Sequence, residues 1–181
     1  MSIVPDQIRF LLVVDTDSIV ARYPKASQDP NNPTSVDHQG QYLICHSPWG
    51  IFSGQATEEM KISVPLDTNV GFFATSIDNN SDGAVILYDI QHHGNISAGN
   101  FAPSLILRAG AVRPDPNSEN GVPPIRQPTT FSNFSSQVKR FGPQRVHICF
   151  AVYTLDDGGE TQNLYGYFRC NPSITVSLIP S

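Results

Sequence analysis

Short apolar runs separated by turn-forming residues recur along the whole 181-residue chain. Residues 8–14 (IRFLLVV) form a continuous apolar run apart from Arg9, whereas residues 60–66 (MKISVPL) alternate between apolar and polar side chains. A continuous run is typical of a strand covered on both faces, and alternation with period two is typical of a strand with one wet face. The pattern predicts about nine strands, at residues 8–14, 41–46, 60–66, 70–77, 84–90, 105–112, 145–155, 164–169 and 174–179.

The stretch at residues 70–90 (VGFFATSIDNNSDGAVILYDI) is central to this pattern. Two apolar runs flank a polar segment at residues 78–83, and the Asp-Gly pair that ends this segment is a turn signal. We therefore expect these two strands to form a hairpin. Pro65 cannot donate a hydrogen bond to a neighbouring strand, so the strand at residues 60–66 is expected at the edge of a sheet.

One helix is predicted, at residues 132–140 (SNFSSQVKR). Ser132 is suited to cap its first turn, and Lys139 and Arg140 complement the negative end of the helix dipole. The remaining long segments are rich in proline, asparagine and glycine and are expected to be loops; they are residues 21–40, 91–100 and 113–130.

Many short strands and a single helix predict an all-β fold. We expect one domain over residues 1–181, an antiparallel β-sandwich of the jelly-roll or immunoglobulin-like kind. The chain shows no internal repeat and is long enough to bury a core.

Charge and cysteine content narrow the classes of function. Charged residues make up 15% of the chain and the net charge is −5, which argues against nucleic acid as a partner. No apolar run approaches the ~18 residues of a membrane span. The N-terminus lacks the layout of a signal peptide, and three cysteines cannot all pair with one another, so reduced thiols in a cytoplasmic protein are expected.

Asp15 and Asp17 follow an apolar run, as in the Asp-x-Asp motif of haloacid-dehalogenase-type phosphatases, and Asp156-Asp157 follow another. Clustered carboxylates of this kind hold Mg²⁺ against phosphate. That fold needs a crossover helix between parallel strands, however, and this chain offers one helix. The sequence therefore favours a strand followed by an acid-capped turn, and no enzyme is predicted.

Metal sites are not predicted, although calcium stays open. Asp115, Asn117 and Glu119 are spaced as in a calcium loop, but Asn120 and Arg126 occupy the positions where an EF-hand has glycine and an acid. Five histidines lack the spacing of a zinc site; they are His38, His46, His92, His93 and His147.

Acidic and amide side chains gather in the first loops, where a sandwich can bind carbohydrate. Trp49 lies in a Pro/Gly turn, and two roles are open for it: its ring could stack on a sugar, or it could cover the core as a lid. The candidate ligand-binding residues are Asp15, Asp17, Asp29, Asn31, Asn32, Asp37 and Trp49.

Several stretches together resemble the bacterial PixA/AidA family, nearly from end to end. They include VVDTD, YPKASQDPNNPTSVDH, NNSDGAVILYDI, RAGAVRPDPNSENGVPP and FAVYTLDDGGETQNLYGYFRCNPSITV. The resemblance implies a cytoplasmic, non-enzymatic protein of the inclusion-body or quorum-sensing-regulated kind, able to accumulate and assemble. It supplies no catalytic residues. The chain departs from methionine-rich members, since it has only Met1 and Met60, and it is closer to the AidA branch.

We therefore expect a self-associating homo-oligomer. Low charge keeps repulsion between copies small, and an exposed edge such as residues 60–66 suits pairing between copies. The alternative is a carbohydrate-binding sandwich, with or without calcium.

Overall fold

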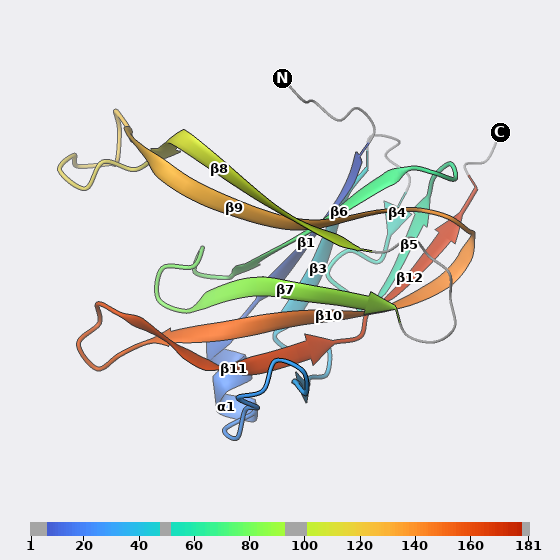
Figure 1. The fold of residues 1–181 in the computed structure, drawn as a ribbon, viewed down its shortest axis with the longest axis horizontal. Helices are drawn as coiled ribbons and strands as arrows, with labels where there is room; N and C mark the ends of the chain where they lie inside the picture. The colour runs from blue at the N-terminus through green and yellow to red at the C-terminus, as the bar shows by residue number, and fades with distance from the viewer. Residues whose placement is uncertain (1–6, 48–51, 93–100, 179–181) are drawn as a thin grey trace.

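The computed structural model describes residues 7–47, 52–92 and 101–178. Two β-sheets pack against each other in this part of the chain, and one short helix lies beside them (Figure 1). The predicted all-β sandwich is confirmed. Twelve strands are present among the described residues rather than about nine, and two of them have only two residues.

The first sheet has five strands, and its two edges are β3 and β8. Its order is β3 (Gln41–His46), β1 (Gln7–Val14), β6 (Asn69–Ser76), β9 (Ile125–Gln137) and β8 (Ala102–Arg113).

The second sheet is built around the long strand β10 (Gly142–Leu155). β12 (Ser173–Ser177) pairs with residues 142–145 of β10, and β11 (Gln162–Cys170) pairs with residues 148–155. β7 (Ala84–His92) pairs with residues 146–153 of β10. The sheet is completed by β2 (Thr34–Ser35) beside β11, and by β5 (Glu59–Ser63) and β4 (Phe52–Ser53) beyond β12.

Both sheets are mixed, whereas the sequence predicted purely antiparallel pairing. β1 is parallel to β6, β2 to β11 and β5 to β12. Each parallel pair joins strands far apart in the chain, and local apolar patterns carry no information about such pairing.

The core lies between the sheets and follows the period-two pattern of the strands. Alternate residues of β1 are buried, and residues 148–152 of β10 are buried on both faces. The ring of Phe10 on β1 stacks on Phe72 of β6 with centroids 4.6 Å apart. The strand residues that supply this core are Ile8, Phe10, Leu12 and Val14 from β1, and Val146, Ile148, Phe150 and Val152 from β10.

The predicted helix at residues 132–140 is wrong, because residues 132–137 belong to β9. Phe134 on β9 is buried and pairs with Phe72 on one side and Pro103 on the other. Pairing with two neighbouring strands and burial of an aromatic side chain outweigh the weak helix signals of serine caps and basic end residues.

The helix of the described chain is α1 (Thr16–Arg22), where the sequence predicted an acid-capped turn and then a loop. Asp15 is its N-cap, and the Asp15 carboxylate accepts hydrogen bonds from the Ser18 backbone N–H (3.0 Å) and hydroxyl (2.7 Å). Ile19 is fully buried. The acids were correctly interpreted as a cap, but the cap begins a helix of two turns.

The predicted hairpin at residues 70–90 is an arch between the two sheets, since β6 lies in the first sheet and β7 in the second. Asn80 holds this arch in place. Its side-chain oxygen accepts hydrogen bonds from the backbone N–H groups of Ser76 (2.9 Å) and Val85 (3.0 Å). A polar segment of six residues is long for a hairpin turn, and here it provides the reach between the layers.

Candidate functional site

A polar cavity of about 210 Å³ opens where β11 gives way to β12. Asn171 and Pro172, which separate these strands, line it together with Asp37, His38 and Glu58. Leu12, Val36 and Leu43 supply apolar lining. The cavity therefore combines two acids, one histidine and two amides, Gln41 and Asn171, at its wall.

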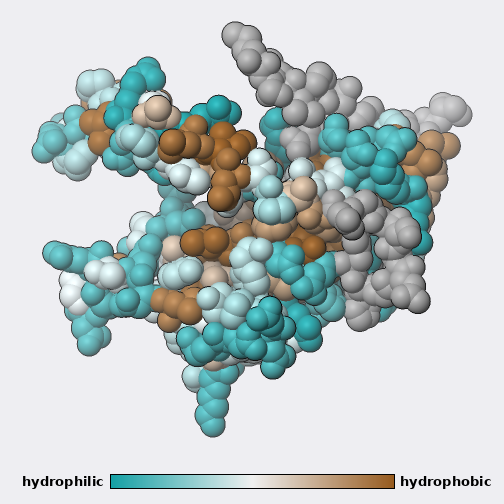
Figure 2. All heavy atoms as spheres, viewed as in Figure 1, coloured by the Kyte–Doolittle hydropathy of each residue, from teal (hydrophilic) through white to brown (hydrophobic). Residues whose placement is uncertain are grey.

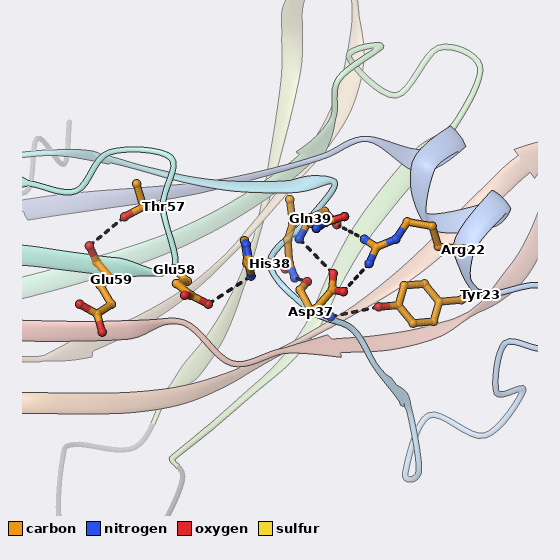
Figure 3. A network of polar contacts seen from close by, with 9 residues as sticks. Arg22, Tyr23, Asp37, His38, Gln39, Thr57, Glu58 and Glu59 are labelled. Carbon is orange, nitrogen blue, oxygen red and sulfur yellow. Dashed lines mark hydrogen bonds and ion pairs between the residues drawn. The ribbon is translucent and has the colours of Figure 1, made fainter.

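The Asp37 carboxylate is engaged by its neighbours (Figure 3). It forms an ion pair with the guanidinium of Arg22, and it accepts the backbone N–H of Gln39 at 3.0 Å. The hydrogen bond from Arg22 lowers the pKa of Asp37, and the Gln39 N–H acts in the same direction. The Asp37 N–H donates to the Tyr23 hydroxyl at 3.1 Å. Asp37 thus anchors its loop to α1.

His38 points the other way, toward Glu58, in the same view (Figure 3). The His38 Nδ1 lies 3.2 Å from a Glu58 carboxylate oxygen, and both side chains are more than half exposed. Pairs this exposed contribute about 0–1 kcal/mol. Among the described residues no three His, Cys, Asp or Glu side chains are close enough to hold a metal ion.

The other predicted ligand-binding residues do not line this cavity. Asp15 caps α1 and Asp17 lies in its first turn. Asp29 accepts the Asn31 backbone N–H at 2.9 Å within its own turn, and Asn32 N–H donates to the Asp29 carbonyl at 3.1 Å. Trp49 lies outside the described residues. Asp37 is the described candidate that reaches the cavity, and the others serve local turns and caps.

The calcium-like spacing at residues 115–119 forms a turn as well. Asp115 accepts the Asn117 backbone N–H at 2.9 Å. The three cysteines are free and buried, as the sequence predicts. Burial raises the pKa of Cys45 to about 12 and that of Cys149 to about 11, and a thiol that stays protonated is a poor nucleophile or metal ligand.

A second feature is a projecting two-stranded ribbon formed by the outer parts of β8 and β9, residues 104–133, which we call the arm. β6 pairs with β9 at residues 134–137, so residues 125–133 of the ribbon have β8 as their one strand partner. Figure 1 shows the arm extending away from the second sheet. The bulge after Arg108 bends β8 within the arm, next to Gly110.

The core-facing side of the first sheet continues along the arm, where the described residues leave it exposed. Leu105 and Leu107 share a face with the buried Phe134, because Leu105 pairs with Ser132 and Pro103 with Phe134. Beyond the bulge Val112 lies on the same side. The exposed fractions of Leu105, Leu107 and Val112 are 76%, 65% and 60%. We call this side the inner face; Figure 2 shows hydrophobic atoms on the arm beside a hollow.

Two turns lie across that hollow from the arm, at residues 77–83 and 155–161, and we call them together the double tip (Figures 1 and 2). The Gln162 side-chain amide ties them, donating to the carbonyl of Ser81 at 2.8 Å. The backbone N–H of Glu160 holds the pKa of Asp156 below its usual range. The double tip carries five acids and no lysine or arginine: Asp78, Asp82, Asp156, Asp157 and Glu160.

Sequence patterns predicted the turn at residues 78–83 but missed the arm. The arm was predicted as one strand, a long loop and a helix, and the exposed edge was assigned to residues 60–66. In the structure β5 has neighbours on both sides, β12 and the two-residue β4, whereas β8 is an edge strand. The sequence did contain one signal of this edge, the run LILRAGAV at residues 105–112. Most of its side chains are apolar, so it lacks the regular polar side chains that discourage an edge strand from pairing with another chain.

The comparisons with known proteins agree with the fold. The sequence profile of PixA, an inclusion body protein, matches residues 6–176. The crystal structure of an inclusion body protein (PixA) from Burkholderia cenocepacia J2315 is similar over 98% of this chain and 100% of its own, with 25% sequence identity and a TM-score of 0.78.

Other comparisons add little. The seventh ScaB type I cohesin from Pseudobacteroides cellulosolvens aligns with 95% of this chain and 94% of its own at 10% identity, but its TM-score of 0.22 supports no argument. No curated protein matches the sequence. The described residues contain no helix long and apolar enough to cross a membrane.

Proposed function

Because the chain belongs to the PixA family of inclusion body proteins, we propose that it is a non-enzymatic, cytoplasmic protein that acts by associating with copies of itself. The observation that carries this proposal is the exposed inner face of the arm. Contiguous exposed apolar side chains on a soluble protein are typical of an interaction surface, and β8 is at the same time an open sheet edge.

The chemistry of the polar side chains supports a non-catalytic role. The thiols of Cys45 and Cys149 have raised pKa values in the core. The carboxylates of Asp15 and Asp37 are held by a helix cap and by Arg22. Reduced thiols also suit the cytoplasm, where disulfides are rare. The carbohydrate-binding alternative has less support, because the candidates that the structure describes are spread among turns and Asp37 alone of these lines the cavity.

Light scattering on the purified protein across a range of concentrations tests the proposal. We expect a mass above that of the 19.8 kDa monomer, and a smaller associated fraction for the double variant Leu105→Ser, Leu107→Ser, since it removes the most exposed apolar side chains of the inner face. Leu178→Ser is the matched control, because Leu178 is 64% exposed and lies outside the arm. A wild-type protein that stays monomeric up to about 1 mM, a weak-binding limit, would contradict the proposal.

A further inference from the structure

We propose that the double tip of a second copy of this chain docks on the inner face of the arm, an inference that rests on the self-association proposed above. The two surfaces differ in charge and match in apolar character. The contact is therefore between unlike surfaces of two identical chains, rather than between two arms.

The arm has the composition of a surface that needs a partner. A two-stranded ribbon alone is marginally stable in water, and a third strand or a packed apolar face is needed to hold it. Ile106 on the other side of the ribbon is half-buried, whereas Leu105 and Leu107 on the inner face are the most exposed apolar side chains of β8. A covering surface would remove these leucines from water.

Charge selects the double tip as that covering surface. The strands of the arm carry three arginines and no acid: Arg108, Arg113 and Arg126. Val112 pairs with Arg126, so Arg126 lies on the inner face, while Arg108 and Arg113 lie on the opposite side of this narrow ribbon. None of the three arginines forms an ion pair within the described residues.

The loop that joins the two strands of the arm adds Asp115 and Glu119 at the far end. The basic charge of the arm therefore belongs to its strands, with Arg126 on the face of the exposed leucines.

The double tip has the opposite pattern. Its five acids also have no ion-pair partner within the described residues. Ile77 and Leu155 precede the acidic turns and are exposed, so the double tip combines exposed apolar side chains with carboxylates. Such a surface complements an inner face that combines exposed leucines with the Arg126 guanidinium, and complementary potentials favour and orient association.

The placement of the two surfaces allows both contacts to form at once. The arm and the double tip lie at the same end of the molecule, on either side of the hollow (Figures 1 and 2). In a two-fold dimer each copy would give its double tip to the arm of the other, so the same contact forms twice. This two-fold arrangement closes on itself, and an interface of standard size needs about 20–30 residues from each partner, which the arm and the double tip together supply.

Charge reversal in the full chain tests the pairing. The first variant makes the inner face of the arm acidic (Arg126→Glu, Thr130→Glu), where Thr130 pairs with Leu107. The second reverses the double tip (Asp78→Lys, Asp157→Lys); all four positions are exposed. Each variant alone places like charges opposite each other and is expected to raise the dimer dissociation constant by a factor on the order of 10–100. An equimolar mixture pairs every reversed surface with its complement and is expected to restore association to within a factor of about three of wild type.

The outcomes separate this inference from the proposal on which it rests. Unchanged circular dichroism establishes that both variants fold. Association weakened by each reversal and restored in the mixture supports the arm–tip contact. A tip-reversed variant that associates as wild type does, or a mixture that stays monomeric, overturns the contact while self-association stands. A monomeric wild type overturns the proposed function itself.

Discussion

Replacing Phe168 with alanine is expected to lower the free energy of unfolding by about 3–5 kcal/mol. Phe168 is 0% exposed and stands at the centre of an aromatic cluster that joins the second sheet to α1. Its ring stacks on Phe150 (centroids 5.9 Å apart) and on Tyr165 (6.3 Å), and meets the edge of Tyr23 at 6.2 Å. Truncation leaves a cavity that these fixed strands cannot close.

Urea unfolding monitored by fluorescence measures this loss, and the melting temperature is expected to fall by about 6–20 °C for a chain of this size. Phe141→Ala is the control, because Phe141 is exposed, and its effect is expected to stay within about 0.5 kcal/mol. Equal effects of the two substitutions would show that the cluster around Phe168 is not a principal part of the core.

Replacing Gly54 with alanine is expected to destabilise the protein by about 2–4 kcal/mol. Gly54 has φ +78°, and an added Cβ would lie 2.0 Å from the carbonyl oxygen of Glu59. The next residue, Gln55, bonds through its side chain to the backbone of Cys45 on β3, accepting the N–H at 2.8 Å and donating to the carbonyl at 2.6 Å. Displacement at Gly54 therefore disturbs both β5 and the edge of the first sheet.

The loss at Gly54 has two causes, the positive φ and the close contact with Glu59. Gly159→Ala separates them, since Gly159 has φ +70° but an added Cβ there meets nothing within 4 Å. This control is expected to cost about 1–2 kcal/mol from the backbone conformation alone. Thermal unfolding of both variants gives the comparison. The close approach at Gly54 would be disproved by equal losses for the two glycines.

The strands of the core were predictable because each one carries its own period-two pattern. β10 alternates Val146, Ile148 and Phe150 toward the core, and β1 presents a run that is apolar except for Arg9 and whose alternate residues are buried. What local patterns lack is pairing between distant strands. β6 and β7 are sequence neighbours joined by a plausible turn, yet they do not pair with each other. β6 pairs with β1 in the first sheet, and β7 pairs with β10 in the second.

The wrong helix has a related cause. Residues 132–140 have weak intrinsic preferences, so the burial of Phe134 against Phe72 determines their conformation. At α1 the sequence contains a suitable N-cap, Asp15. Seven residues are too few to show a helical apolar period, and the buried side of this helix consists of Thr16 and Ile19.

The candidate ligand-binding residues were chosen by type, and their roles depend on partners that the sequence does not indicate. Asp37 was predicted, but its ion pair with Arg22 and its place at the cavity follow from the position of α1. The arm was missed because its residues look like an ordinary strand and a proline-rich loop. The arm is exposed because it extends away from the second sheet, which the sequence does not indicate (Figure 1).

Hydrogen–deuterium exchange at low and high protein concentration tests the central claim most directly, because it reports which backbone segments a second copy protects. If the arm and the double tip meet between copies, amides in residues 104–113, 125–133, 77–83 and 155–161 become more protected as association proceeds, while the exposed edge strand β3 is unchanged. Association measured in the same samples with no added protection in the arm would contradict the account.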